Sequence, residues 1–269
     1  QSHFALHQNA RPGRDFRQEF AQRRQAARDI EIEPFLRRPA HDYTAGTDAP
    51  TLMELHAPRG PPVVHPFEPD RAECQCQASV EILDDPKLKT GYEKLWRGFL
   101  SYHDSEEGWS IEYDGIDPGY LSATVSFLAK IYQTNPDPEI LKVAQQSIKF
   151  CSYFVYPNGF YAGSLGSRNT LHFYSHGFEV FAKKIPLAAS VAEKMLYALS
   201  ENKLVPPEII SDRYVFYRVP EYLQSYVDYS EYSQELPSIP YEQNQLNQYS
   251  KKSKIWIHSD DKCYIVANL

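Results

Sequence analysis

The feature that most constrains the fold is an Asp-Pro pair that recurs directly before an apolar helical pattern. The pairs are Asp85-Pro86, Asp117-Pro118 and Asp137-Pro138. An aspartate side chain can accept hydrogen bonds from the first N–H groups of a helix. Proline suits the first helical position because it lacks an N–H that would be unpaired there. Each pair therefore predicts the start of a helix.

Apolar residues after each pair recur every three or four positions, as on one face of an α-helix. The faces are Leu88, Tyr92, Leu95, Phe99 and Tyr102; Leu121, Val125, Leu128 and Tyr132; and Leu141, Ala144, Ile148, Cys151 and Val155. The pattern also predicts a helix over 186–199, a less regular one near 171–184 and a short one around 220–229. Short connections predict antiparallel helix pairs, and the chain is expected to be mainly α.

The last sixteen residues, KIWIHSDDKCYIVANL, follow a different pattern. Two apolar triplets, Ile255–Ile257 and Tyr264–Val266, flank the polar run Ser-Asp-Asp-Lys, which predicts a β-hairpin. Because an isolated hairpin is marginally stable in water, we expect it to need strands from outside this chain, or a partner surface.

Composition divides the chain into three segments. Residues 1–77 hold ten of the fourteen arginines and no lysine, and residues 57–70 include five prolines. We expect 1–77 to be largely irregular and foreign to the rest. Residues 78–228 should form the helical domain, and 229–269 a linker and the hairpin.

Charge, apolar content and cysteine spacing argue against nucleic-acid binding, a membrane span and a metal or disulfide framework. A net charge of −7 without a strong basic patch argues against nucleic-acid binding. No apolar stretch approaches the length of a membrane span. The cysteines, Cys74, Cys76, Cys151 and Cys263, form neither a zinc-ribbon pattern nor a disulfide scaffold, so no metal or cofactor is predicted. The 20 tyrosines suit either a glycan-binding surface or an ordinary core.

Three stretches carry a family resemblance: GWSIEYDGIDPGYLSATVSFLAKIY, YPNGFYAGSLGSRNTLHFYSHGFE and the C-terminal KIWIHSDDKCYIVANL. Over residues 80–269 the chain resembles the heparinase II/III-like polysaccharide lyases. The resemblance implies an incomplete α/α toroid followed by the first hairpin of a truncated antiparallel β-sandwich. It also implies an acidic polysaccharide partner, such as a glycosaminoglycan, and a periplasmic or secreted location.

The chemistry of such a lyase sets what a site must hold. The enzyme removes the C5 proton of a uronate and expels the O4 substituent. The uronate carboxylate must be neutralised, a base must take the proton and an acid must protonate the leaving oxygen. The resemblance places the catalytic tyrosine at Tyr120, near the start of a helix whose partial positive charge would favour a tyrosinate. The alternative is that Tyr120 packs that helix against its neighbour.

The run 163–179, GSLGSRNTLHFYSHGFE, offers the substrate-binding candidates. Arg168 and Asn169 can donate hydrogen bonds to a carboxylate. His172 and His176 would share a face if the segment is helical, and they are also expected to contact substrate. The alternatives are that Ser167 or Asn169 caps a helix and the histidines pack, or that the histidines bind a metal, for which an adjacent carboxylate ligand is lacking.

An acidic cluster offers a competing hydrolase interpretation, since toroid glycosidases use two carboxylates. Its members are Glu106, Glu107, Glu112, Asp114 and Asp117. Asp117 is better explained as a helix cap, and Glu106 and Glu107 as solvated loop charges. The sequence therefore predicts a lyase-like protein acting by β-elimination on a uronic-acid glycan. The alternatives are a C5-epimerase of the same fold and a non-catalytic glycan-binding or scaffold module.

Overall fold

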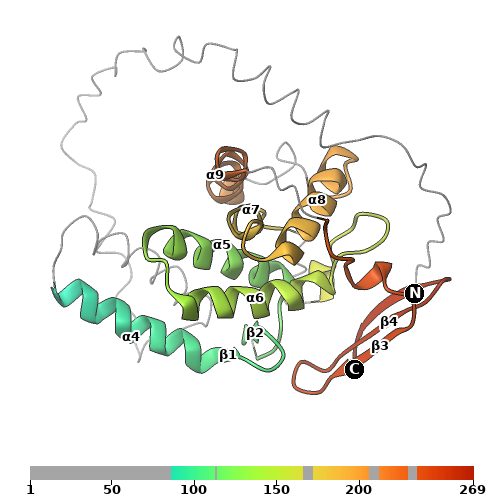
Figure 1. Ribbon diagram of the computed structural model, residues 1–269, viewed down its shortest axis with the longest axis horizontal. Helices are drawn as coiled ribbons and strands as arrows, with labels where there is room; N and C mark the ends of the chain where they lie inside the picture. Colours follow the sequence, from blue (N-terminus) through green and yellow to red (C-terminus); the bar gives the residue numbers. More distant parts are fainter. Residues whose placement is uncertain (1–85, 113, 166–171, 206–211, 230–234) are drawn as a thin grey trace, which may run out of the picture. The chain divides into compact units, whose positions relative to one another are not determined.

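The computed structural model describes residues 86–112, 114–165, 172–205, 212–229 and 235–269, all of which belong to one compact unit, residues 64–269. Predictions for residues 1–77 lie outside this range. The described chain is mainly helical with small antiparallel sheets (Figure 1). The elements are α4 (Pro86–Tyr102), β1 (His103–Asp104), β2 (Trp109–Ser110), α5 (Pro118–Thr134), α6 (Pro138–Ser152), η1 (Gly163–Leu165), α7 (His176–Phe181), α8 (Pro186–Ser200), α9 (Asp212–Asp228), η4 (Pro240–Glu242), β3 (Leu246–Ser250), β4 (Ile255–Ser259) and β5 (Tyr264–Asn268).

Helix starts follow the Asp-Pro pairs, as predicted. Asp117 accepts a hydrogen bond of 3.0 Å from the backbone N–H of Tyr120, and Asp137 accepts one of 2.7 Å from Glu139. Prolines also open α4 and α8. The sequence located the starts of α4, α5, α6 and α8, although the predicted apolar face of α6 ran to Val155, three residues past its end at Ser152. In the described part of the chain, no helix combines the length and the apolar character that a membrane crossing requires.

Two helical predictions were wrong in extent. The segment near 171–184 holds only the six-residue α7, and residues 172–175 are irregular, so His172 and His176 do not share a helix face. The expected short helix near 220–229 is the C-terminal part of the seventeen-residue α9, which continues through Pro220. Proline removes one intrahelical hydrogen bond, and α9 keeps its place through buried polar contacts described below.

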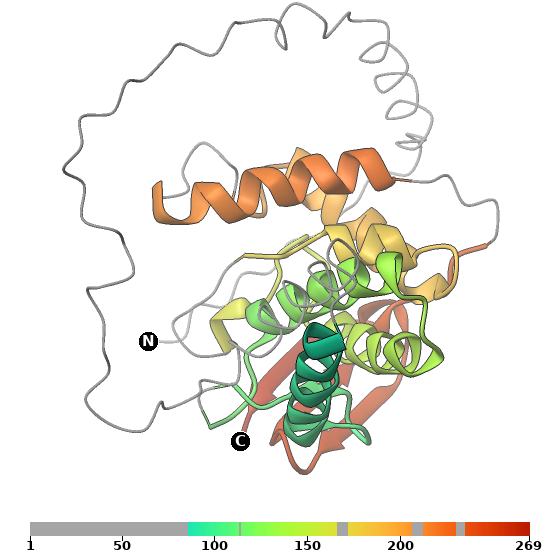
Figure 2. The same cartoon turned by 90° about the vertical axis from the view of Figure 1, so that its left-hand side faces the viewer.

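The core is built around α5, whose side chains are buried on almost every face. Helix α6 packs along one side of α5 and α7 crosses another (Figures 1 and 2). The α7 crossing is close because Gly177 lies directly against the α5 backbone. A Cβ atom at Gly177 would lie 2.6 Å from the carbonyl carbon of Val125 and 2.7 Å from the nitrogen of Ser126.

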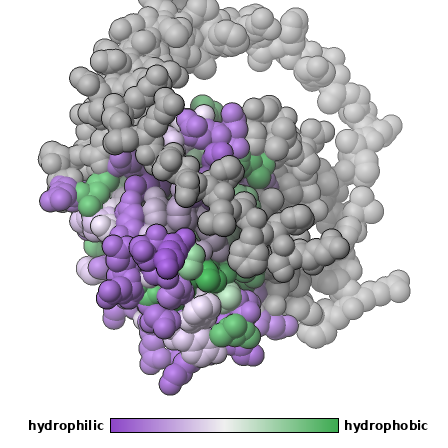
Figure 3. All heavy atoms as spheres, turned by 90° about the vertical axis from the view of Figure 1, so that its right-hand side faces the viewer, coloured by the Kyte–Doolittle hydropathy of each residue, from purple (hydrophilic) through white to green (hydrophobic). Residues whose placement is uncertain are grey.

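The C-terminal hairpin forms as predicted, with β4 and β5 antiparallel. The expectation that it needs strands from elsewhere was wrong, because β3 of this chain pairs with the other edge of β4. Ile255, Ile257 and Val266 are buried in the same core as the helices. Tyr264 also donates a 2.7 Å hydrogen bond to the carbonyl of Tyr153. Figure 3 shows the side on which β3 and β4 lie in Figure 1; its described residues are mostly hydrophilic, with small apolar patches between them.

Glu107 joins the first loop to the sheet and is not the solvated charge that the sequence suggested. Its carboxylate accepts the backbone N–H groups of Lys252 (2.8 Å) and Ser253 (2.9 Å) and the indole N–H of Trp109 (2.9 Å). These bonds lower the pKa of Glu107, although burial opposes them. Neighbouring Glu106 is exposed and pairs with the Lys252 ammonium at 2.7 Å.

The close approach at Gly177 predicts that Gly177→Ala destabilises the protein by about 1–3 kcal/mol, the usual effect of overpacking. The matched control is Gly98→Ala within α4, where a new Cβ meets nothing within 4 Å. That change should instead raise the free energy of unfolding by about 0.5–1 kcal/mol. Urea unfolding measures both, and equal effects of the two substitutions would contradict the close packing of α7 on α5.

Candidate functional site

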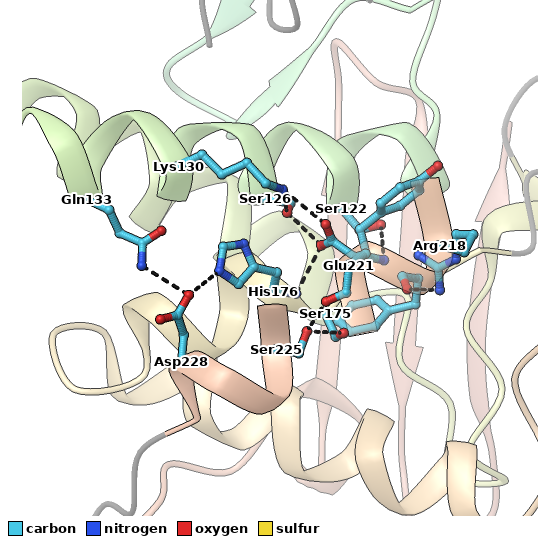
Figure 4. Close-up of polar contacts among 12 residues, drawn as sticks. Ser122, Ser126, Lys130, Gln133, Ser175, His176, Arg218, Glu221, Ser225 and Asp228 are labelled. Carbon is cyan, nitrogen blue, oxygen red and sulfur yellow. Dashed lines mark hydrogen bonds and ion pairs between the residues drawn. The ribbon is translucent and has the colours of Figure 1, made fainter. Parts of the chain in front are cut away.

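Buried polar side chains meet where α5, α7 and α9 come together (Figure 4). Helix α9 contributes the residues spaced three or four apart, which lie on one face of a helix. They are Arg218, Glu221, Ser225 and Asp228. The facing residues are Ser126, Lys130 and Gln133 of α5 and Ser175 and His176 at the start of α7. Three helices therefore share one polar interior.

The carboxylate of Glu221 occupies the centre of this cluster and is only 4% exposed. It accepts hydrogen bonds from the hydroxyl of Ser126 at 2.6 Å and from the backbone N–H of His176 at 3.0 Å. Its second oxygen pairs with the Lys130 ammonium at 3.0 Å. Both oxygens are thus engaged by α5 and α7, as a buried charge requires.

His176 is 1% exposed and lies beside the second carboxylate. Its Nε2 is 2.6 Å from Oδ2 of Asp228, which also accepts a 3.1 Å hydrogen bond from the amide of Gln133. Burial lowers the pKa of His176, the Lys130 ammonium adds to this effect, and Asp228 opposes it. The lowered pKa favours the neutral imidazole, whose Nε2 can donate a hydrogen bond to the Asp228 carboxylate.

Arg218 differs from Glu221 because its hydrogen bonding to the described residues is incomplete. It is 1% exposed, and its Nη2 donates to the carbonyl of Phe173 at 2.6 Å and to the hydroxyl of Tyr222 at 2.8 Å. The guanidinium carbon lies 4.5 Å and 4.8 Å from the ring centroids of Tyr174 and Tyr222. Nε and Nη1 have no hydrogen-bond partner among the described residues.

His172 lies within the electrostatic influence of Arg218. Burial, followed by the positive charge of Arg218, lowers the pKa of His172 to about 4. At neutral pH this imidazole is uncharged and can accept a proton or a hydrogen bond. The sequence proposed His172 as a substrate contact, and the structure places it in the same electrostatic environment as Arg218.

The predicted site residues are only partly brought together. His176 joins the polar cluster, whereas Tyr120 is 8% exposed in the first turn of α5. The described hydrogen bonds join α5 to the polar cluster further along the helix, at Ser126, Lys130 and Gln133. Arg168 and Asn169 lie outside the described residues.

The acidic cluster has structural partners at several positions. Asp117 is the N-cap of α5, as predicted, and Glu107 binds the sheet. Glu112 is 3% exposed and belongs to a β-bridge with Gly115. In this arrangement the hydrolase interpretation gains no support.

Sequence reasoning missed Arg218 and Glu221, two buried charged residues of α9. A signal was present in their spacing, because positions 218, 221, 225 and 228 are all polar and lie on one helical face. It was hidden because Pro220 was read as the start of a helix. Scans of the chain against protein-family models, curated proteins and solved structures find no match.

The position of Glu221 predicts that Glu221→Gln lowers the free energy of unfolding by about 3 kcal/mol, because it leaves Lys130 without its buried partner. Glu106→Gln is the matched control, since it removes a 76% exposed carboxylate that pairs with Lys252. We expect Glu106→Gln to lower the free energy of unfolding by less than about 1 kcal/mol. Chemical denaturation measures both, and a similar small loss for both variants would rule out a central role for Glu221.

The depressed pKa of His172 predicts a specific pH dependence of stability. Its ordinary value is 6.5 and its value in the folded protein is about 4. Between these values the unfolded chain binds more protons at His172, so acidification from pH 6.5 to 4 lowers the free energy of unfolding. His172→Gln removes this titration and should flatten that part of the curve. Urea unfolding across the pH range measures the difference, and parallel curves would contradict the assignment.

Proposed function

We propose that the chain is part of a polysaccharide lyase-like protein that acts on uronic-acid glycans by β-elimination. In this proposal the pairs α5–α6 and α7–α8 belong to an incomplete α/α toroid, and β3–β5 begin a β-sandwich. The observation that carries the proposal is the buried guanidinium of Arg218 beside His172, two of whose nitrogens have no hydrogen-bond partner in the described part of the chain.

Arg218 has the properties required to mask a uronate charge. A buried cation without a full set of acceptors is unfavourable, and a carboxylate is the natural partner of a guanidinium. Removing the C5 proton places further negative charge next to the carboxylate, so a cation fixed there stabilises the transition state. Because Arg218 is buried, side chains that cover it, Tyr174 and Tyr222 among them, must move when the glycan binds.

The elimination then needs one base and one acid. The C5–H and C4–O bonds break, a C4–C5 double bond forms and the leaving oxygen takes a proton. Neutral His172 can accept the C5 proton, and the phenol of Tyr120 is the candidate donor or second base. Asn169 and Arg168 remain proposed contacts to the sugar.

A non-catalytic glycan-binding module is the second candidate function. It is favoured by the burial of Tyr120, which is 8% exposed in the first turn of α5 and so offers little surface to a substrate. A protein with Arg218 in place and no reacting phenol would bind a uronate without cleaving it. A C5-epimerase would share the first proton transfer and leave the chain intact.

The test incubates the full chain with uronic-acid polysaccharides and records the ultraviolet absorbance of the unsaturated sugar that elimination produces. We expect Tyr120→Phe to lower the rate by about 10²–10⁴-fold, the range for one acid–base group, while binding persists. Arg218→Gln should weaken binding, measured by affinity electrophoresis. Arg97→Gln, which changes an exposed arginine of α4, is the matched control and should have no effect.

Each remaining outcome decides between the candidates. Binding that depends on Arg218 without an unsaturated product would support the binding module. Exchange of the C5 hydrogen with deuterated solvent in an uncleaved chain would identify an epimerase. Equal binding by the wild type, Arg218→Gln and Arg97→Gln proteins would contradict the proposal.

A further inference from the structure

Three different metal-ligating side chains converge at the turn between β4 and β5. They are His258 near the end of β4, Asp260 in the turn and Cys263 just before β5. One nitrogen, one oxygen and one sulfur atom from these residues all lie within 4.8 Å of one another. This cluster belongs to the sheet, and the polar cluster of α5, α7 and α9 uses none of its residues.

The backbone of the turn holds the carboxylate in place. Oδ1 of Asp260 accepts the N–H groups of Lys262 and Cys263, both at 2.8 Å. The N–H of Asp260 in turn donates to the carbonyl of Cys263 at 3.1 Å. These bonds leave Oδ2 facing Nε2 of His258 at 3.2 Å. The two backbone donors also hold the pKa of Asp260 well below its usual range, so it is ionised at neutral pH.

The imidazole is positioned from its other side. Its ring stacks on the indole of Trp256, with centroids 5.7 Å apart and planes 19° from parallel. The indole is itself fixed by a 2.8 Å hydrogen bond to Asn247 of β3. The ligating atoms therefore lie on a paired strand and a hydrogen-bonded turn. Their side chains are already held close together before an ion binds.

We propose that Nε2 of His258, Oδ2 of Asp260 and Sγ of Cys263 bind Zn²⁺, with water completing a tetrahedral site. Mixed imidazole, carboxylate and thiolate ligands suit Zn²⁺, whereas Mg²⁺ and Ca²⁺ prefer oxygen ligands alone. The carboxylate and the thiolate would neutralise both charges of the ion. A bound ion would also link the end of β4 to the start of β5.

The experiment titrates Zn²⁺ and Co²⁺ into the full chain with Cys74 and Cys76 replaced by serine, so that these thiols do not compete. We expect one ion per chain, a thiolate-to-Co²⁺ charge-transfer band and a change in Trp256 fluorescence. The affinity for either metal ion should rise with pH because the metal displaces the proton of the Cys263 thiol. His258→Ala and Cys263→Ser should each weaken binding at least about tenfold, since even groups that only support a ligand contribute that much.

Asp261→Asn is the matched control, because it removes a carboxylate from the same turn without touching the three ligands. Its affinity for Zn²⁺ should equal that of the protein in which only Cys74 and Cys76 are replaced. Circular dichroism of the metal-free variants checks that each remains folded. The proposal is overturned if Cys263→Ser keeps the charge-transfer band, or if Asp261→Asn weakens binding as much as His258→Ala does.

Discussion

The buried carboxylate of Glu221 is the interaction on which the arrangement of α5, α7 and α9 depends. It accepts hydrogen bonds from Ser126 on α5 and from the backbone of His176 at the start of α7, and it pairs with Lys130. A carboxylate without these donors would be costly at 4% exposure. Rotating or sliding α9 would break all three contacts together, so this group sets the register of the helix.

This arrangement reverses the usual polarity of a surface helix. The inward side of α9 carries Arg218 and Glu221, whereas Leu223 and Val227 on the same helix are 60% and 70% exposed. Pattern rules assume that the apolar face points to the core. Applied to α9, they assign the wrong face and miss both buried charges. The helix continues through Pro220, and hydrogen bonds from α5 and α7 to Glu221 help to hold it in place.

Elements fixed by local chemistry were predictable from the sequence, and elements fixed by distant contacts were not. An aspartate cap and its proline act within one turn, so the starts of α5 and α6 were located from the sequence alone. The start of α7 is different: Ser175 makes no capping bond and contacts Ser225 of α9, fifty residues away. Strand β3 was missed for a similar reason, because it alternates weakly and gains its stability from pairing with β4.

The two buried charges of α9, Glu221 and Arg218, differ in how completely the described residues satisfy their hydrogen bonds. Glu221 has a donor for each oxygen, so its contacts account fully for its burial. Arg218 is just as buried and uses one nitrogen, while Nε and Nη1 have no partner among the described residues. A charge retained only to position α9 would gain by satisfying these groups within the protein. Under the proposed function, the carboxylate of an acidic sugar would supply the acceptors that the described residues do not.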